Sequence, residues 1–129
     1  MCHGLSSSLK AFGTWFSTQT LGECRRAMGG LGYSRYAQVG VLYHDSEVNQ
    51  TYEGDNDILQ QQTAKMLFRN LSWMMKGKHV LETCEFMTMD DPDMEELRAD
   101  LSVKNMIRLF KKRAKDLTFE AGQTLSTAP

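Results

Sequence analysis

Apolar side chains recur near the start of the chain at steps of three and four residues, which is the spacing of one face of an α-helix. This stripe consists of Leu5, Leu9, Phe12 and Phe16, and it then drifts to Leu21, Cys24 and Met28. The adjacent glycines Gly29 and Gly30 permit backbone conformations that end helices. The pattern therefore predicts a helix at about residues 5–28.

The segment between Gly29 and Gly54 shows no sustained helical stripe. Its main apolar feature is a short β-branched and aromatic run, Val39 to Tyr43. We therefore expect a loop here, with a brief extended stretch over that run.

A second helix is predicted from Asp55 and Asn56, because both residue types cap helix N-termini. The following positions at helical steps are Leu59, Thr63, Met66, Leu67, Leu71 and Met74. Gly77 is expected to end the helix. We expect the methionines at helical spacing, Met66, Met74 and Met75, to fill gaps in the core, which a flexible thioether does well.

Residues 82–100 carry eight acidic side chains and one basic side chain. This charge predicts a solvated connector, with one helical turn after Pro92. A third helix is expected from Ser102, and it has the clearest apolar stripe in the chain. The stripe consists of Val103, Met106, Ile107, Phe110, Ala114, Leu117, Ala121 and Leu125. Such a face must pack on another surface.

The opposite face of the third helix is basic, with Lys104, Arg108, Lys111, Lys112, Arg113 and Lys115. One interpretation is a solvated face whose charge balances the acidic connector before it. The alternative is a membrane surface or a partner helix of the kind that calmodulin binds.

The composition limits the function classes. The chain has 129 residues, 41% hydrophobic and 24% charged, which is typical of one soluble globular domain. Its formal net charge of -1 argues against a nucleic-acid binder, and no apolar run is long enough to span a bilayer. The three cysteines and three histidines are widely spaced, so we expect a reducing compartment, no disulfide framework and no metal site.

The fold class predicted from these patterns is all-α. Three separated apolar stripes in so short a chain leave much surface unpaired. We therefore expect a piece of a larger assembly.

The chemically informative segment is Thr51 to Asn56, in which Glu53 precedes Gly54 at the entry to the second helix. The glycine lets a ligand or another backbone approach closely, and the unpaired N–H groups of a first helical turn can hold an anion. The alternative is that Glu53, Asp55 and Asn56 only cap the helix. The spacing leaves both interpretations open.

The string from Glu23 to Tyr33, followed by Tyr52 to Asn56 and Gln61 to Ala64, resembles the flavin-dependent acyl-CoA oxidases. It is most similar to the peroxisomal branch that handles branched-chain acyl-CoA. The resemblance is strong over residues 4–71 and weaker over 105–126. It departs from the family pattern at Leu31, where the oxidases usually have His, and at Met28, where they often have Cys.

The resemblance implies part of the C-terminal helical bundle of these enzymes, with long helices and a glycine-rich loop. Residues 1–77 would be the end of the flavin-contacting helical domain, and residues 78–101 the acidic connector. Residues 102–129 would be the first helix of the second C-terminal domain. The N-terminal helical domain and middle β-domain of the family do not fit in this chain, so we expect the isolated chain to be inactive.

The activity that the resemblance implies is desaturation of acyl-CoA to trans-2-enoyl-CoA, with reduction of O2 to H2O2. Glu53 would be the catalytic base, and burial against substrate and flavin would raise its pKa. Tyr52, Glu53 and Gly54 would contact the substrate. FAD would be held largely by the neighbouring subunit of a homodimer. Its contacts with this chain would be Gly29, Gly30, Gly32, Asp55 and Asp57.

The resemblance also implies a peroxisomal enzyme of fatty-acid β-oxidation. The chain ends in Ser126 to Pro129 and not in a Ser-Lys-Leu type of address. Two alternatives remain open at this point. One is part of an acyl-CoA dehydrogenase, and the other is a non-catalytic helical fragment that pairs with intact subunits.

Overall fold

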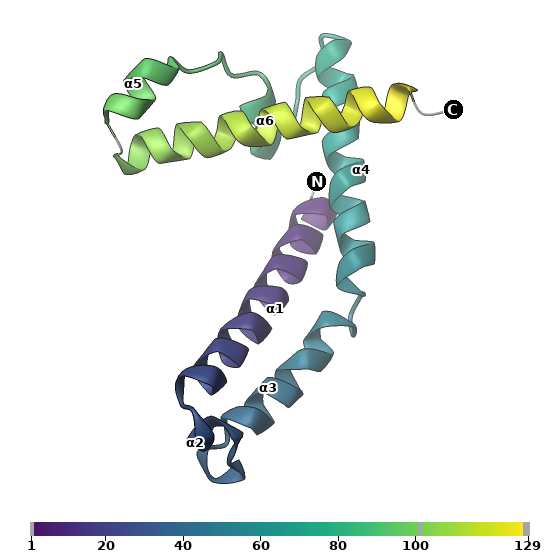
Figure 1. Cartoon of the computed structure of the whole chain (residues 1–129). Helices are drawn as coiled ribbons and strands as arrows, with labels where there is room; N and C mark the ends of the chain where they lie inside the picture. The colour runs from purple at the N-terminus through teal and green to yellow at the C-terminus, as the bar shows by residue number, and fades with distance from the viewer. Residues whose placement is uncertain (1, 101, 128–129) are drawn as a thin grey trace. The chain divides into compact units, whose positions relative to one another are not determined.

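The computed structural model describes residues 2–100 and 102–127, and Ala128 and Pro129 of the C-terminal tetrapeptide lie outside them. Its helices are α1 (Cys2–Ala27), α2 (Gly30–Tyr33), α3 (Val39–Glu47), α4 (Asn56–Met75), α5 (Met94–Ala99) and α6 (Val103–Thr127) (Figure 1). Short 3-10 turns, η1 to η3, cover Arg35–Ala37, Val48–Gln50 and Glu82–Met87. The described residues form no strand, so the all-α prediction is confirmed.

The chain divides into two compact units, Met1–Lys65 and Met66–Pro129, which are described separately below. The division falls inside α4. The family domain boundaries expected at residues 77 and 101 stay a prediction.

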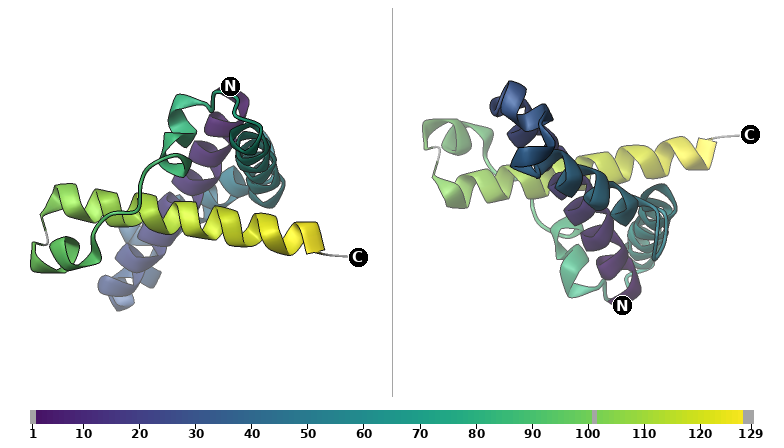
Figure 2. Two further views of the ribbon diagram at one scale, coloured as in Figure 1. Left: turned by 90° about the horizontal axis from the view of Figure 1, so that it is seen from above. Right: turned by 90° about the horizontal axis from the view of Figure 1, so that it is seen from below.

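In the first unit, α1 and α3 lie side by side and α2 forms the corner between them (Figures 1 and 2). The buried side chains of α1 are small: Ser7, Ala11 and Thr18. Small side chains let helix backbones approach closely, and the Thr18 and Ser46 hydroxyls lie 3.4 Å apart across the contact. The predicted stripe from Leu5 to Phe16 faces solvent instead, with Phe12 67% exposed. Periodicity located this helix correctly and its buried face wrongly.

The run Val39 to Tyr43 is helical, so the expected loop with an extended stretch is wrong. Gln38 adopts a left-handed conformation (φ 62°), and its carbonyl oxygen accepts the N–H groups of Val41 and Leu42. The Tyr43 ring then packs beside Gly22 of α1. This tertiary contact outweighs the weak helix propensity of β-branched residues.

In the second unit, the core is built from Met66, Leu71, Cys84 and Met87. Cys84 and Met87 belong to η3, so the expectation of a wholly solvated connector is wrong. Burial raises the pKa of the Cys84 thiol. Met74 packs against this core as expected, whereas Met75 is 78% exposed and the expectation for it is wrong.

A buried amide fixes the connector to α4. Asn70 is fully buried; its Nδ2 donates to the Met66 carbonyl oxygen at 2.8 Å, and its Oδ1 accepts the Leu81 N–H at 2.9 Å. Further along, α5 provides the helical turn expected after Pro92, with the Asp93 carboxylate accepting the Glu95 N–H as an N-cap.

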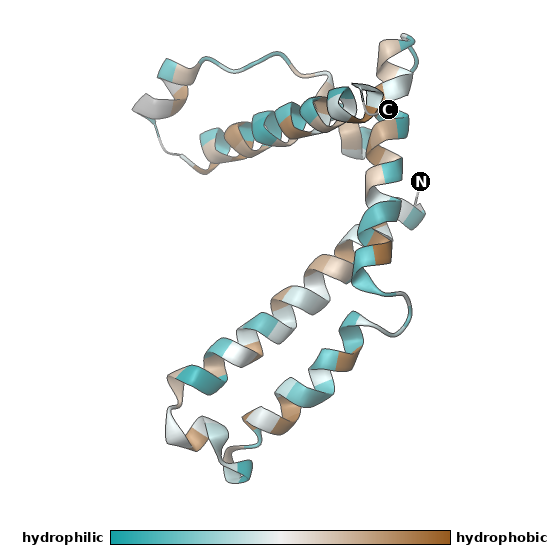
Figure 3. Cartoon of the chain, turned by 45° about the vertical axis from the view of Figure 1, so that its right-hand side comes forward, coloured by the Kyte–Doolittle hydropathy of each residue, from teal (hydrophilic) through white to brown (hydrophobic). Residues whose placement is uncertain are grey.

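The buried residues of α6 are Asn105 and Thr118, and Phe119 packs partly buried against the core. Most of the apolar stripe of α6 is exposed. The colouring of Figure 3 shows hydrophobic residues alternating with hydrophilic ones along this helix. Thus no described residue of the second unit covers the face that was expected to pack.

Candidate active site

Glu53 lies in the turn between η2 and α4. Glu53 has φ 55° and Gly54 has φ 105°, so two successive residues adopt the left-handed region. A Cβ on Gly54 would be strained at that φ and would also meet the Leu59 side chain at 3.1 Å. The turn therefore requires glycine at 54, and it leaves the Glu53 side chain exposed.

A polar network holds this turn against α1. The Lys10 ammonium donates to the Gly54 carbonyl oxygen at 2.6 Å and to Asn56 Oδ1 at 2.9 Å. Asn56 is 3% exposed, and its Nδ2 donates to Thr14 Oγ1 at 2.9 Å and to the Ala11 carbonyl oxygen at 3.4 Å. The residues flanking the turn are thus fixed to a long helix, which restrains the position of Glu53.

Sequence reasoning missed Lys10 and Thr14 as parts of the site. Their signal is a polar pair at i and i+4 on the same face of α1 as the buried Ala11. Charged groups on a buried face need partners, and the partner here comes from more than forty residues away. A search of α1 for polar residues away from its apolar stripe would have found Lys10 and Thr14, but it would not have identified Asn56 as their partner.

Asp55 has a capping role. Its Oδ1 accepts the Asp57 N–H at 2.9 Å, and its backbone oxygen accepts the Leu59 N–H at 2.9 Å, so it is the N-cap of α4. The expected start of this helix at Asp55 and Asn56 is confirmed. A hollow of about 260 Å³ opens here, lined by Trp15, Glu47, Gln50, Thr51, Asp55, Asn56 and Asp57. Tyr52 and Glu53 lie outside that lining, and both are exposed.

The three glycines after α1 have different surroundings. Gly29 has φ 56° and precedes α2, and its N–H donates to the Arg26 carbonyl oxygen at 3.0 Å. Gly30 is exposed, and a Cβ there would meet nothing within 4 Å. Gly32 is buried, and a Cβ there would overlap the Arg25 carbonyl oxygen. Gly32 is therefore required by packing, whereas Gly29 and Gly30 are open to a ligand.

The structure does not bring the glycines and Glu53 together. Figure 1 places α2 at one end of the α1–α3 pair and the Glu53 turn, just before α4, at the other. The intervening residues 39–50 are helical and span roughly 18 Å at 1.5 Å per residue. The two groups thus belong to separate places on the surface of the first unit.

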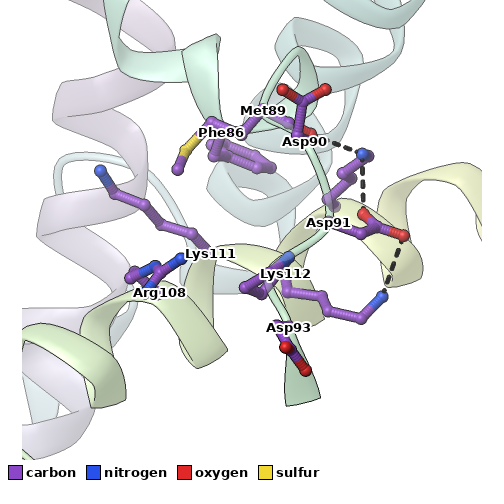
Figure 4. A pocket seen from close by; sticks show the side chains of 10 residues that line it. Phe86, Met89, Asp90, Asp91, Asp93, Arg108, Lys111 and Lys112 are labelled. Atoms are coloured by element: carbon purple, nitrogen blue, oxygen red, sulfur yellow. Dashed lines mark hydrogen bonds and ion pairs between the residues drawn. The ribbon is translucent and has the colours of Figure 1, made fainter. Parts of the chain in front are cut away.

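The second unit has a hollow of about 470 Å³ between the acidic loop and α6 (Figure 4). Asp91 pairs with Lys115 at 3.0 Å and with Lys112 at 3.5 Å, and the Lys115 ammonium donates to the Met89 carbonyl oxygen at 2.7 Å. The hydrogen bond from Lys115 and the nearby Lys112 charge lower the pKa of Asp91. These contacts support the charge-balance interpretation of the basic face of α6.

No three His, Cys, Asp or Glu side chains among the described residues are grouped to hold a metal ion. In the same residues, no helix is both long and apolar enough to cross a bilayer.

Comparison with known proteins decides the family. Residues 1–68 match the family model of the acyl-CoA oxidase C-alpha1 domain. The chain belongs to the acyl-CoA oxidase family. The match covers both the glycine string and the Glu53 turn.

Relatives and solved structures agree with this assignment. The chain is 32% identical over 126 residues to an acyl-coenzyme A oxidase of Debaryomyces hansenii, covering 93% of this chain and 18% of that protein. It is 48% identical over 65 residues to human peroxisomal acyl-coenzyme A oxidase 3, covering 50% of this chain and 9% of that protein. The crystal structure of acyl-CoA oxidase 1 from Yarrowia lipolytica matches 98% of this chain and 20% of its own, at a TM-score of 0.84 and 27% identity. The chain thus spans about a fifth or less of each relative.

Proposed function

We propose that this chain supplies the catalytic base of an FAD-dependent acyl-CoA oxidase, and that the base is Glu53. The observation that supports this most directly is the turn itself. The Glu53 side chain is exposed, and Glu53 and Gly54 both adopt left-handed backbone conformations. Hydrogen bonds from Lys10 to the Gly54 carbonyl oxygen and to Asn56 hold this turn against α1. A cap alone needs no such arrangement, because Asp55 already caps α4.

The chemistry assigned to Glu53 is a proton transfer. One carboxylate oxygen accepts the α-proton of the acyl thioester, forming an O–H bond while the electron pair of the broken C–H bond stays on the substrate. That proton is acidic only when the thioester carbonyl is polarised. Among the described residues no acceptor is bonded to the Glu53 N–H, so this donor is available to the thioester oxygen.

FAD, when bound, supplies the acceptor for the hydride from the β-carbon, and O2 takes up the electrons to give H2O2. Gly29 and Gly30 fit a close approach of a cofactor, since both are exposed and a Cβ on either would meet nothing within 4 Å. Gly32 does not fit this role, because the Arg25 backbone already fills the space in which a Cβ of residue 32 would lie. Asp57 is exposed, whereas one carboxylate oxygen of Asp55 is engaged in capping.

The distance between the glycines and Glu53 supports a cofactor site completed by a second subunit. A single chain of this kind would contact one FAD at Gly29 and Gly30 and another beside Glu53. We also propose that Tyr52 and Gly54 contact the substrate. The enzyme would be a homodimer, and it would act in peroxisomal β-oxidation. The names of the human and Arabidopsis relatives support the compartment, since both are called peroxisomal.

The test uses a hybrid oxidase, in which the matching segment of the Yarrowia enzyme is replaced by this chain. We expect the hybrid oxidase to retain FAD and to release H2O2 with acyl-CoA. The Glu53→Gln variant should keep FAD and lose activity by about 10²–10⁴-fold. Asp45→Asn, an exposed acid on α3, is the matched control and should leave the rate unchanged. A rate that Glu53→Gln leaves intact would refute the assignment.

A further inference from the structure

The ammonium of Lys10 contacts the chain on the C-terminal side of the proposed base. It donates to the Gly54 carbonyl oxygen at 2.6 Å and to Asn56 Oδ1 at 2.9 Å. Both acceptors are neutral oxygens, so these bonds act on the geometry of the turn and do not neutralise a carboxylate. We propose that Lys10 is a positioning residue for proton transfer to Glu53, because it holds the turn in the conformation from which the carboxylate reaches the substrate. This inference rests on the proposed function.

The backbone of the turn needs a contact from outside to keep its conformation. Glu53 has φ 55°, a left-handed conformation that a side chain makes unfavourable. Gly54 follows with φ 105°, and glycine has the widest conformational freedom of any residue, so it does not hold its neighbour in place. Strained residues of this kind persist only where the surrounding structure fixes them. Without such a contact, Glu53 is free to return to negative φ, which would move its side chain.

The helix that follows does not supply this contact, whereas Lys10 does. The Leu59 N–H donates to the Asp55 carbonyl oxygen at 2.9 Å, so the hydrogen bonds of α4 begin one residue after Gly54. The Gly54 carbonyl oxygen instead accepts from Lys10, and this bond fixes the peptide group between Gly54 and Asp55. Loss of the ammonium would therefore free the backbone beside the base, while the cap of α4 stays intact.

The ammonium is itself held in place by a buried amide. Asn56 is 3% exposed, and its Nδ2 donates to Thr14 Oγ1 at 2.9 Å and to the Ala11 carbonyl oxygen at 3.4 Å. These bonds fix Asn56 Oδ1, which gives Lys10 a second acceptor at a set position. Lys10, Ala11 and Thr14 all belong to α1, so one helix sets both the donor and the amide that orients it. A residue supported in this way can hold a functional group precisely.

The experiment compares Lys10→Met, Glu53→Gln and the double variant in the hybrid oxidase, by H2O2 release and by the ratio of FAD to protein. We expect Lys10→Met to keep FAD and KM nearly unchanged and to lower kcat by about 10–10²-fold, because a misplaced base slows the chemical step. In the Glu53→Gln enzyme the same change should have almost no further effect, since no base is left to position. Thr18→Val is the matched control: it removes a buried hydroxyl of α1 that contacts Ser46 of α3, and it should leave kcat unchanged.

The outcomes separate this proposal from the proposed function. A kcat that Lys10→Met leaves intact while Glu53→Gln lowers it would overturn the positioning role alone. An equal fold-loss from Lys10→Met in both backgrounds would also overturn it, because Lys10 would then only support the fold. If Lys10→Met does not retain FAD, Lys10→Gln repeats the comparison, and loss of FAD in both variants would overturn the positioning role as well. An unchanged rate in Glu53→Gln would instead refute the proposed function, and the positioning role with it.

Discussion

The ammonium of Lys10 donates a hydrogen bond to the carbonyl oxygen of Gly54, at 2.6 Å and across 44 positions of the chain. Gly54 follows Glu53 directly, so this bond restrains the backbone beside the proposed base. Both residues of the bond belong to the segment that matches the family model. The bond between Lys10 and Gly54 thus links helix α1 to the turn that carries the proposed base.

Removing this bond should destabilise the first unit. We expect Lys10→Met, which keeps the aliphatic stem, to lower the free energy of unfolding by about 1–3 kcal/mol, because two charged hydrogen bonds are lost. Urea unfolding of the chain measures this change. Lys65→Met is the control, since Lys65 is exposed on α4 and should cost less than about 0.5 kcal/mol. Equal losses for the two variants would show that the Lys10 bonds contribute nothing.

The glycines Gly30 and Gly32 should respond differently to alanine. Gly32→Ala places a Cβ on the Arg25 carbonyl oxygen, and the required shift should cost about 1–3 kcal/mol or more. Gly30→Ala meets open space and should leave the unfolding midpoint nearly unchanged. In the hybrid oxidase, by contrast, Gly30→Val should lower the ratio of FAD to protein after gel filtration. An unchanged ratio would remove Gly30 from the cofactor site.

Asp91 should make the second unit sensitive to acid. Its pKa is lower in the folded chain than in an unfolded one, chiefly through the hydrogen bond from Lys115. A lowered folded pKa contributes stability above the unfolded value of about 3.9, and that contribution is lost as the pH falls toward the folded pKa. Thermal unfolding should therefore separate the natural chain from Asp91→Asn at pH 7, and the two should converge in acid. Asp90→Asn, from the same loop, is the control for the loss of one acidic side chain.

The isolated chain should neither retain FAD nor oxidise acyl-CoA. The carboxylate of Glu53 is exposed, and Glu53 lies outside the lining of the neighbouring hollow. Orientation of a substrate against a catalytic group accounts for roughly 7–11 kcal/mol of a barrier. Absorbance of the purified chain after incubation with FAD, together with a peroxide assay, measures both properties. A chain that holds FAD and releases H2O2 would show that these residues suffice for catalysis.

Helical periodicity and glycine punctuation predicted α1, α4 and α6 to within a few residues. They predicted the buried face of α4, where Met66 and Leu71 are core residues, but not the buried faces of α1 and α6. In α1 the small residues Ser7 and Ala11 make the contacts while Phe12 is exposed, because close approach of two backbones favours small side chains. An apolar stripe marks a face to be covered, but it does not show whether the same chain covers it.

Two elements escaped prediction for a different reason. The helix α3 and the buried turn η3 depend on contacts with distant residues: Tyr43 beside Gly22, and Leu81 bonded to Asn70. Local propensity carries no information about such partners. At the site, the family resemblance pointed to Glu53, whereas the hydrogen bonds from Lys10 to Gly54 and Asn56 were found only in the structure.

In the proposed function, the Glu53 carboxylate removes the α-proton of acyl-CoA. The most direct measurement is exchange of that proton with solvent in the hybrid oxidase, followed by mass spectrometry in D2O without O2. We predict that the enzyme with Glu53 incorporates deuterium at the α-carbon and that Glu53→Gln slows this exchange by at least about 10²-fold. Exchange at the same rate in both proteins would contradict the assignment of Glu53 as the base.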